Sequence, residues 1–193
     1  MPVTLGLKHL FIGIWLLLLL ALGWYWWQNP AAFRPENIAH FIETNCSSLW
    51  LGFVIVSLVR GLFLIPNTPI VIVGAMLFPE DPFWVIGISL LGILFSGSIV
   101  YHLHHLTGVR TYFERHHPKQ LALWERRLSK KGGFAFVVGW SLFPLVPTDL
   151  LCYAAGVVGI PYRYLFTGVL IGEAVLVSCL VYTGSELFHW LVA

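Results

Sequence analysis

The sequence predicts an all-α polytopic membrane protein, an inverted repeat of two re-entrant, proline-broken helical hairpins, each followed by a transmembrane helix. Composition is the first reason: 58% of the 193 residues are hydrophobic and 10% are charged, whereas soluble domains carry roughly a quarter charged residues. The second is a pair of apolar runs, 49–78 and 134–160, that prolines interrupt. The third is a basic segment between the runs, which sets the orientation in the bilayer.

Residues 1–48 are expected to form an N-terminal transmembrane helix and an interfacial linker. The apolar run 10–27 ends in the aromatic cluster Trp24–Trp27, and at ~1.5 Å per residue it nearly crosses a ~30 Å hydrocarbon core. A cleaved signal peptide is the alternative, because Ala21–Gly23 resembles a small-residue cleavage site. A retained helix is favoured. Residues 28–48 are mixed in polarity and predict a short helix at the membrane surface.

The remainder, 49–193, is read as one membrane domain, and its first element is a hairpin over 49–78. One span needs about 20 residues and two need about 40 plus a turn, so 30 residues fit neither. A hairpin that enters, breaks and returns fits better, because proline removes a backbone donor and the freed carbonyl groups then need polar company. A full span over 83–107 follows. The break comprises Pro66, Asn67, Thr68 and Pro69, and Arg60 precedes it.

Residues 108–133 are predicted as a cytoplasmic loop, because basic residues of short loops stay on the cytoplasmic side of the membrane. This orientation puts the N-terminus in the cytoplasm, opens the first hairpin to the outside and opens the second to the inside. The loop holds most of the basic residues of the chain, namely Arg110, Arg115, Lys119, Arg126, Arg127, Lys130 and Lys131.

The second hairpin, 134–160, repeats the pattern of the first. Its run is broken at Pro144 and Pro147, and Thr148 and Asp149 follow directly. A duplicated, inverted unit with broken helices that meet near the midplane is the sequence signature of a transport site. The same pattern can also arise by chance in a polytopic protein.

The last predicted span, 162–184, carries a Gly168-x-x-x-Gly172 motif and the acidic residue Glu173. Small residues at this spacing let two helices approach closely. We expect the motif to serve either a homodimer or a contact within the chain.

Three charged residues lie inside apolar runs, where each costs ~2.5–3.5 kcal/mol to insert. Asp149 is the leading candidate to carry protons, because a carboxyl group in a region of low dielectric can hold a proton unless a cation is near. Glu173 is a second candidate, and Arg60 offers a permanent positive fork suited to phosphate. In the competing explanation, Arg60 and Asp149 merely neutralise each other and hold the hairpins together. Thr68 and Thr148 are expected to satisfy carbonyl groups freed at the breaks.

An enzyme is not predicted, because the sequence has no metalloprotease, nucleophile-elbow or P-loop motif. The three histidines His102, His104 and His105 are expected at the membrane surface, and the chain lacks the ligand spacing of a closed zinc site. No metal, cofactor or nucleic-acid partner is expected.

Two stretches resemble the VTT domain of the DedA and SNARE-associated Golgi protein superfamily. One runs from Arg60 to Gly108, and the other is Phe143-Pro-Leu-Val-Pro-Thr-Asp-Leu-Leu-Cys-Tyr-Ala-Ala-Gly156 followed by Ile160-Pro161. The resemblance covers about 50–185. It implies re-entrant hairpins and movement of lipids across a membrane, polyprenyl phosphate carriers in bacteria or phospholipids in eukaryotes, and, in bacteria, proton coupling through intramembrane carboxylates and arginines.

Two features depart from the family pattern. Many relatives carry an arginine where this chain has Ser141, and the acidic residues Glu80 and Asp81 follow the first hairpin instead of lying at its break. These departures leave the identity of the lipid open.

From the resemblance, the expected function is that of a DedA-type transporter in the bacterial cytoplasmic membrane, which moves a lipid with an anionic headgroup. The alternative is a non-transporting scaffold or assembly factor for envelope homeostasis, which would tolerate Asp149→Asn and Arg60→Leu.

Overall fold

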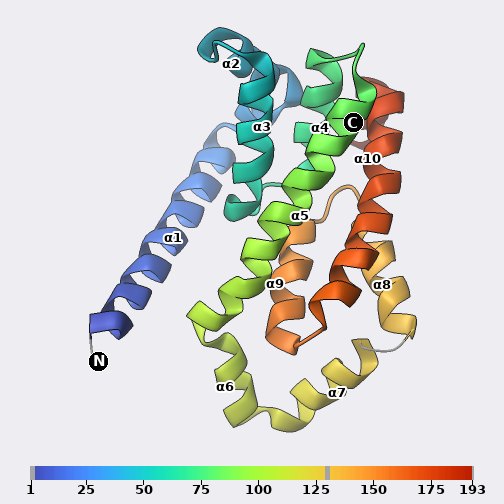
Figure 1. Ribbon diagram of the computed structural model, residues 1–193. Helices are drawn as coiled ribbons and strands as arrows, with labels where there is room; N and C mark the ends of the chain where they lie inside the picture. The colour runs from blue at the N-terminus through green and yellow to red at the C-terminus, as the bar shows by residue number, and fades with distance from the viewer. Residues whose placement is uncertain (1–2, 129–130, 193) are drawn as a thin grey trace.

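The computed structural model describes residues 3–128 and 131–192, and every regular element within them is a helix (Figure 1). The predicted all-α class is confirmed. The α-helices are α1 (Val3–Gln28), α2 (Pro35–Asn45), α3 (Leu49–Val59), α4 (Asn67–Leu77), α5 (Pro82–Thr107), α6 (Val109–His116), α7 (Pro118–Leu128), α8 (Lys131–Ser141), α9 (Thr148–Val158) and α10 (Tyr162–Val192), and two short 3-10 helices are η1 (Pro30–Phe33) and η2 (Arg60–Phe63).

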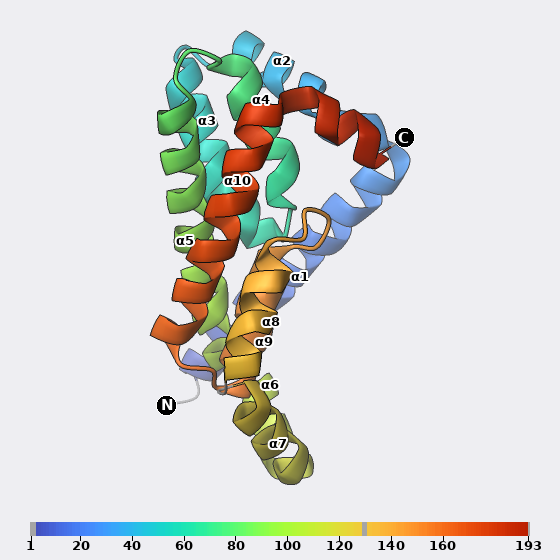
Figure 2. The same cartoon turned by 90° about the vertical axis from the view of Figure 1, so that its right-hand side faces the viewer.

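Two helices of the described chain are long and apolar enough to cross a membrane, Pro82–Thr107 and Tyr162–Gly184. They are α5 and the main part of α10, and they pack against each other. The backbone leaves helical geometry at Gly184, which has a positive φ of 58° that glycine adopts without strain. Figure 2 shows α10 turning sharply near its end.

The first broken segment is α3 and α4, which reverse direction at the turn between them. Arg60–Phe63 extends α3 as the 3-10 helix η2, and Leu64 then adopts a left-handed conformation with φ 56°. Pro66 stands at the N-cap of α4 with φ −54°. Because proline lacks the N–H group that a helix interior needs, the chain restarts a helix here instead of continuing one.

The second broken segment is α8 and α9, joined by the irregular residues 142–147. Pro147 holds the N-cap of α9, as Pro66 does for α4. Figures 1 and 2 show the α3 and α4 pair at the end of the molecule that carries α2, and the α8 and α9 pair towards the end that carries α6 and α7. The two turns meet about midway along the long helices.

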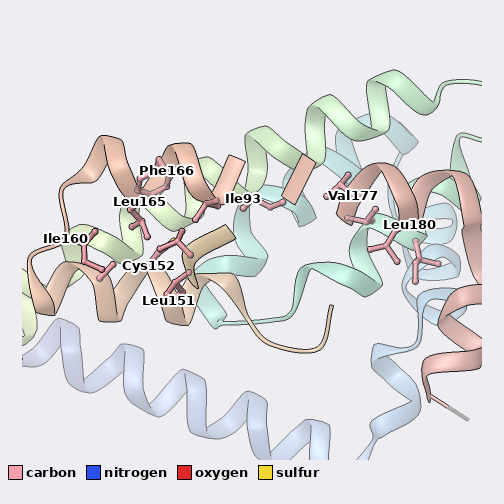
Figure 3. Packing of buried hydrophobic residues seen from close by; sticks show 13 residues of the cluster. Ile93, Leu151, Cys152, Ile160, Leu165, Phe166, Val177 and Leu180 are labelled. Atoms are coloured by element: carbon pink, nitrogen blue, oxygen red, sulfur yellow. The ribbon is translucent and has the colours of Figure 1, made fainter. Parts of the chain in front are cut away.

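The largest buried cluster joins both halves of the chain. It combines side chains of α4, α5, α8, α9 and α10, including Ile72, Ile93, Val137, Cys152 and Leu165 (Figure 3). Helices α5 and α10 are the elements that the broken segments share: α5 lies against α3, α4 and α9, and α10 lies against α4, α8 and α9.

The Gly168-x-x-x-Gly172 motif faces α8 of the same chain. A Cβ atom added at Gly168 would lie 2.7 Å from Val137 Cγ1, and one added at Gly172 would lie 2.7 Å from the carbonyl oxygen of Val138. The small residues therefore serve a contact within the chain, and a homodimer would have to use another face.

The segment predicted as a basic loop is largely helical. Helices α6 and α7 occupy it, and only residues 129–130 of the segment, Lys130 included, lie outside the described residues. The physical reason is amphipathicity: Leu121 is buried whereas Arg115, Arg126 and Arg127 are exposed. An ion pair of 2.8 Å between Arg110 Nε and Glu114 Oε1, one turn apart, supports α6.

Helix α1 is joined to the rest of the molecule at the first turn. The indole Nε1 of Trp15 donates a hydrogen bond of 2.8 Å to the carbonyl oxygen of Leu62 in η2. The prediction of an N-terminal helix begins at residue 10, and α1 begins earlier, at Val3; residues 1 and 2 lie outside the described part of the chain.

Candidate functional site

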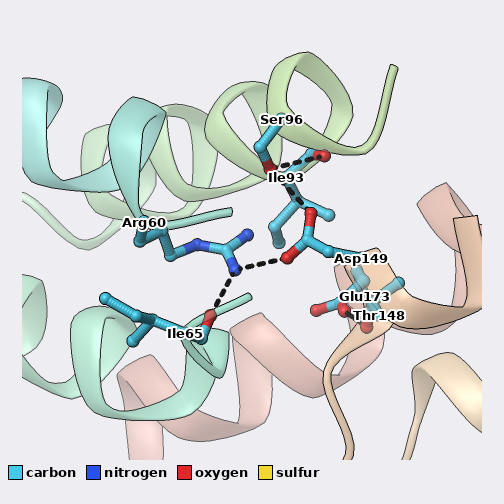
Figure 4. A network of polar contacts seen from close by, with 7 residues as sticks. All are labelled: Arg60, Ile65, Ile93, Ser96, Thr148, Asp149 and Glu173. Carbon is cyan, nitrogen blue, oxygen red and sulfur yellow. Dashed lines mark hydrogen bonds and ion pairs between the residues drawn. The ribbon is translucent and has the colours of Figure 1, made fainter. Parts of the chain in front are cut away.

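A buried ion pair lies where the two turns meet. Arg60 Nη1 and Asp149 Oδ2 are 3.0 Å apart, although 89 positions separate the residues in sequence. Their side chains are 2% and 1% exposed. Figure 4 shows the two groups pointing at each other from η2 and α9.

Both charged residues lie where the two turns meet, because a helix ends at one of them and begins at the other. Arg60 stands at the junction of α3 and η2, so its side chain leaves a helix that is ending. Asp149 lies in the first turn of α9, two residues after Pro147. A carboxylate is favoured at a helix N-terminus, where unpaired N–H groups and the helix dipole present positive partial charge.

Each oxygen of the Asp149 carboxylate has its own partner. Oδ2 faces Arg60, and Oδ1 accepts a hydrogen bond of 2.9 Å from Ser96 Oγ in α5. Arg60 Nη1 also donates to the carbonyl oxygen of Ile65 at 3.1 Å, in the turn itself. The pair thus connects the first turn, α5 and α9.

Glu173 is the third predicted charge, and α10 brings it next to the pair. It is 1% exposed, and Oε1 accepts a hydrogen bond from Thr148 Oγ1. The side-chain amide of Asn67 lies beside the Glu173 carboxyl but outside hydrogen-bonding geometry. Arg60, Asp149 and Glu173 are therefore one cluster and not three separate buried charges.

The remaining predicted residues line the two turns. Thr68 Oγ1 donates a hydrogen bond of 2.5 Å to the carbonyl oxygen of Pro144, so one turn satisfies a backbone acceptor of the other. Thr148 acts differently from the expectation, because its hydroxyl group donates to Glu173 and not to a backbone carbonyl. Pro69 occupies the first turn of α4, where the missing N–H group costs no helical hydrogen bond.

Several polar atoms of this region are buried and have no partner among the described residues. An unpaired buried donor costs about 1–3 kcal/mol, so such atoms are rare unless they serve a purpose. Arg60 has two such atoms: Nη1 has hydrogen-bond partners, whereas Nε and Nη2 have none among the described residues. The set comprises Arg60 Nε and Nη2, Asn67 Nδ2, Trp140 Nε1, Ser141 Oγ and Glu173 Oε2.

Ser141 lies at a tight crossing of α8 and α10. Ser141 is 0% exposed, and a Cβ atom added at Gly172 would lie 2.6 Å from the Cβ atom of Ser141. The chain therefore has a small side chain at a close helix crossing, at the position where the resemblance suggests an arginine. The permanent positive charge of this cluster comes from Arg60.

Sequence reasoning missed Ser96 as a site residue. A serine in an apolar span is a hydrogen-bond donor for a buried carboxylate, and this signal could have identified it. The three histidines of α5 lie away from the cluster, and the described residues contain no group of three metal-ligating side chains.

Comparison with known proteins gives one match. The VTT domain family matches the chain over residues 65–186, which include Pro66, α5, the second turn, α9 and Glu173, whereas Arg60 and η2 precede the matched region. No curated protein and no solved structure matches the chain.

Proposed function

The chain belongs to the VTT domain family, and on this premise we propose that it is an integral membrane protein of the DedA type that translocates a lipid with an anionic headgroup. Family membership and two apolar helices of spanning length establish the membrane protein. The lipid, its movement and the cytoplasmic membrane of a bacterium as the location belong to the proposal.

The observation that carries the proposal is the unpaired part of Arg60. Its guanidinium keeps Nε and Nη2 without a partner among the described residues while it is almost fully buried. A planar guanidinium with two free donors suits a phosphate oxygen pair. The N-termini of α4 and α9 lie at the two turns, which the hydrogen bond from Thr68 to the Pro144 carbonyl joins. Helix N-termini add N–H groups and positive partial charge that favour an anion.

We infer an arrangement in the membrane from the same geometry. The α3 and α4 pair and the α8 and α9 pair are proposed as re-entrant hairpins that enter from opposite sides, which makes the halves an inverted repeat. The basic helices α6 and α7 then face the cytoplasm with the N-terminus. In other transporters, broken helices of this kind hold the substrate near the midplane.

The cluster also suggests how lipid movement is coupled to protons. A phosphate that binds Arg60 competes with Asp149 for the guanidinium, so Asp149 loses its cation while the headgroup is bound. In this proposal, Asp149 carries the proton once the headgroup has displaced it from Arg60. Glu173, whose Oε2 is unpaired among the described residues, is the next acceptor on the path.

The direct test is transbilayer movement in proteoliposomes. Fluorescent phospholipid and a polyprenyl phosphate are followed with and without a pH gradient, for the wild type, for Asp149→Asn and for the exposed control Glu43→Gln. We expect movement in the wild type and the control and its loss in Asp149→Asn. Absence of movement above empty vesicles, for folded wild-type protein, would refute lipid translocation.

A double variant separates transport from scaffolding. Removal of one partner of a buried pair costs about 3–5 kcal/mol, because the other charge stays unpaired. The neutral pair Arg60→Gln and Asp149→Asn avoids that cost, so we expect it to fold better than either single variant. A transporter then remains inactive although folded, whereas a scaffold that uses the pair only for packing regains its function.

A further inference from the structure

A second polar and aromatic feature lies far from the ion-pair cluster. A cavity of about 370 Å³ opens between α3 and α5, near the end of the molecule that carries α2. Its volume falls in the range of small-molecule sites, about 300–1,000 Å³. Its lining consists of Trp50, Val54, Asp81, Trp84 and Ile88.

Two indole rings form its aromatic lining. Trp50 is held by Phe78, whose ring stacks on it with centroids 3.6 Å apart and planes at 12°. Trp84 lies in the first turn of α5 and is 68% exposed. Indole faces carry negative electrostatic potential and attract cations.

Asp81 adds a full negative charge to the same cavity. It occupies the N-cap position of α5, yet its side chain makes no capping hydrogen bond. Asp81 has no ion pair with any residue that the structure describes. The carboxylate is thus available to a cation from outside the chain.

We propose that this cavity binds an alkylammonium group, such as the choline or ethanolamine part of a zwitterionic lipid headgroup or of a soluble amine. Proteins recognise quaternary ammonium ions by the faces of aromatic rings such as tryptophan, and the Asp81 carboxylate adds attraction for the positive charge. The position suits a headgroup, because a helix of spanning length has its ends at the membrane surfaces. The site selects a charge opposite to that selected by Arg60 and does not depend on the proposed translocation.

The competing explanation is that the two tryptophans only anchor the protein at the membrane surface. An anchor has no need of a positive charge in its ligand. Choline and its neutral isostere 3,3-dimethylbutan-1-ol have nearly the same shape and differ in charge, so they separate the two explanations.

The test is ¹⁹F NMR of the full chain labelled with 5-fluorotryptophan, in a detergent without an ammonium headgroup. The chain has nine tryptophans, and the Trp84 resonance is assigned by its disappearance in Trp84→Phe. We expect choline to shift this resonance in a saturable manner and the neutral alcohol to leave it unchanged. We expect Asp81→Asn to weaken choline binding by up to about fivefold, because an exposed ion pair contributes at most about 1 kcal/mol.

Glu80→Gln is the matched control, because it removes the same charge from the neighbouring exposed residue, which does not line the cavity. Equal shifts by choline and the neutral alcohol, no saturable choline shift, or equal effects of Asp81→Asn and Glu80→Gln would each overturn the proposal. Nanodiscs identify the source of the amine. A Trp84 shift in phosphatidylcholine relative to phosphatidylglycerol discs supports a lipid headgroup, and a shift with free choline alone supports a soluble ligand.

Discussion

The close packing of η2 against α5 at the ion-pair cluster depends on the absence of a side chain at Gly61. A Cβ atom added there would lie closer than 3.0 Å to both side-chain atoms of Ser96 and 2.8 Å from Asp149 Oδ1. Heavy atoms in comfortable contact are about 3.5–4.0 Å apart. Gly61→Ala must therefore move η2 away from α5 by about 1 Å, at the point where Ser96 holds the Asp149 carboxylate.

The expected cost follows from overpacking a well-packed interior, which is about 1–3 kcal/mol. The displacement also lengthens the 3.0 Å contact between Arg60 and Asp149, so activity should fall together with stability. An alanine in an unconstrained helix position acts the other way and stabilises by about 0.5–1 kcal/mol. Gly87 is that position in α5, since a Cβ atom added there has no neighbour within 4 Å.

The assay is unfolding of the purified protein in detergent, with lipid movement measured in parallel. We expect Gly61→Ala to unfold more easily than the wild type and Gly87→Ala to unfold no more easily. Addition of Ser96→Gly to Gly61→Ala removes the two closest colliding atoms at the cost of the hydrogen bond to Asp149, and should restore part of the stability. A Gly61→Ala protein as stable and active as Gly87→Ala would refute the close approach of η2 and α5.

Further predictions concern contacts between elements. Gly172→Ala should destabilise the protein by about 1–3 kcal/mol, because the new methyl group meets a carbonyl oxygen of α8; Gly139→Ala in α8, which has open space, should not, and denaturation of both variants checks this. Thr68→Val should cost about 1–3 kcal/mol, because a backbone acceptor of the second turn loses its hydrogen bond; a variant as stable as the wild type in the same denaturation assay would contradict it. Trp15→Phe should weaken the attachment of α1 by about 1 kcal/mol, seen as faster proteolysis of the N-terminal segment, whereas the exposed Trp27→Phe should not change the cleavage rate.

The charged residues of the candidate site could be identified from the sequence, and a pairing of Arg60 with Asp149 was one of the two explanations that the sequence left open. The contact of Glu173 with Thr148 was not predicted. Arg60, Asp149 and Glu173 stand out because a charge inside an apolar run is expensive wherever the run folds. Their distances depend on how α5, α9 and α10 pack. The roles of Ser96 and Gly61 were missed because both residue types are common in membrane helices for reasons of packing alone.

The segment between the hairpins, residues 108–133, was predicted only in part. Its positive charge is evident in the sequence. Its helices could not be predicted, because charged residues predominate in α6 and α7 and few apolar residues, such as Leu121, face inward. The aromatic cavity could not be predicted from the sequence either. Trp50 and Trp84 are far apart in sequence, and only the packing of α3 and α5 brings them both to Asp81.

By itself, the sequence determined that the protein is helical and belongs to the membrane, where its helices break, and which charges are buried. These are properties of single residues and local runs: transfer to a bilayer is summed residue by residue, and a proline removes its donor in any fold. Only the tertiary structure decided that Arg60 meets Asp149, that Thr148 serves Glu173, and that Gly168 and Gly172 pack within the chain. Such pairings depend on the packing of helices distant in sequence, which no local property of the chain specifies.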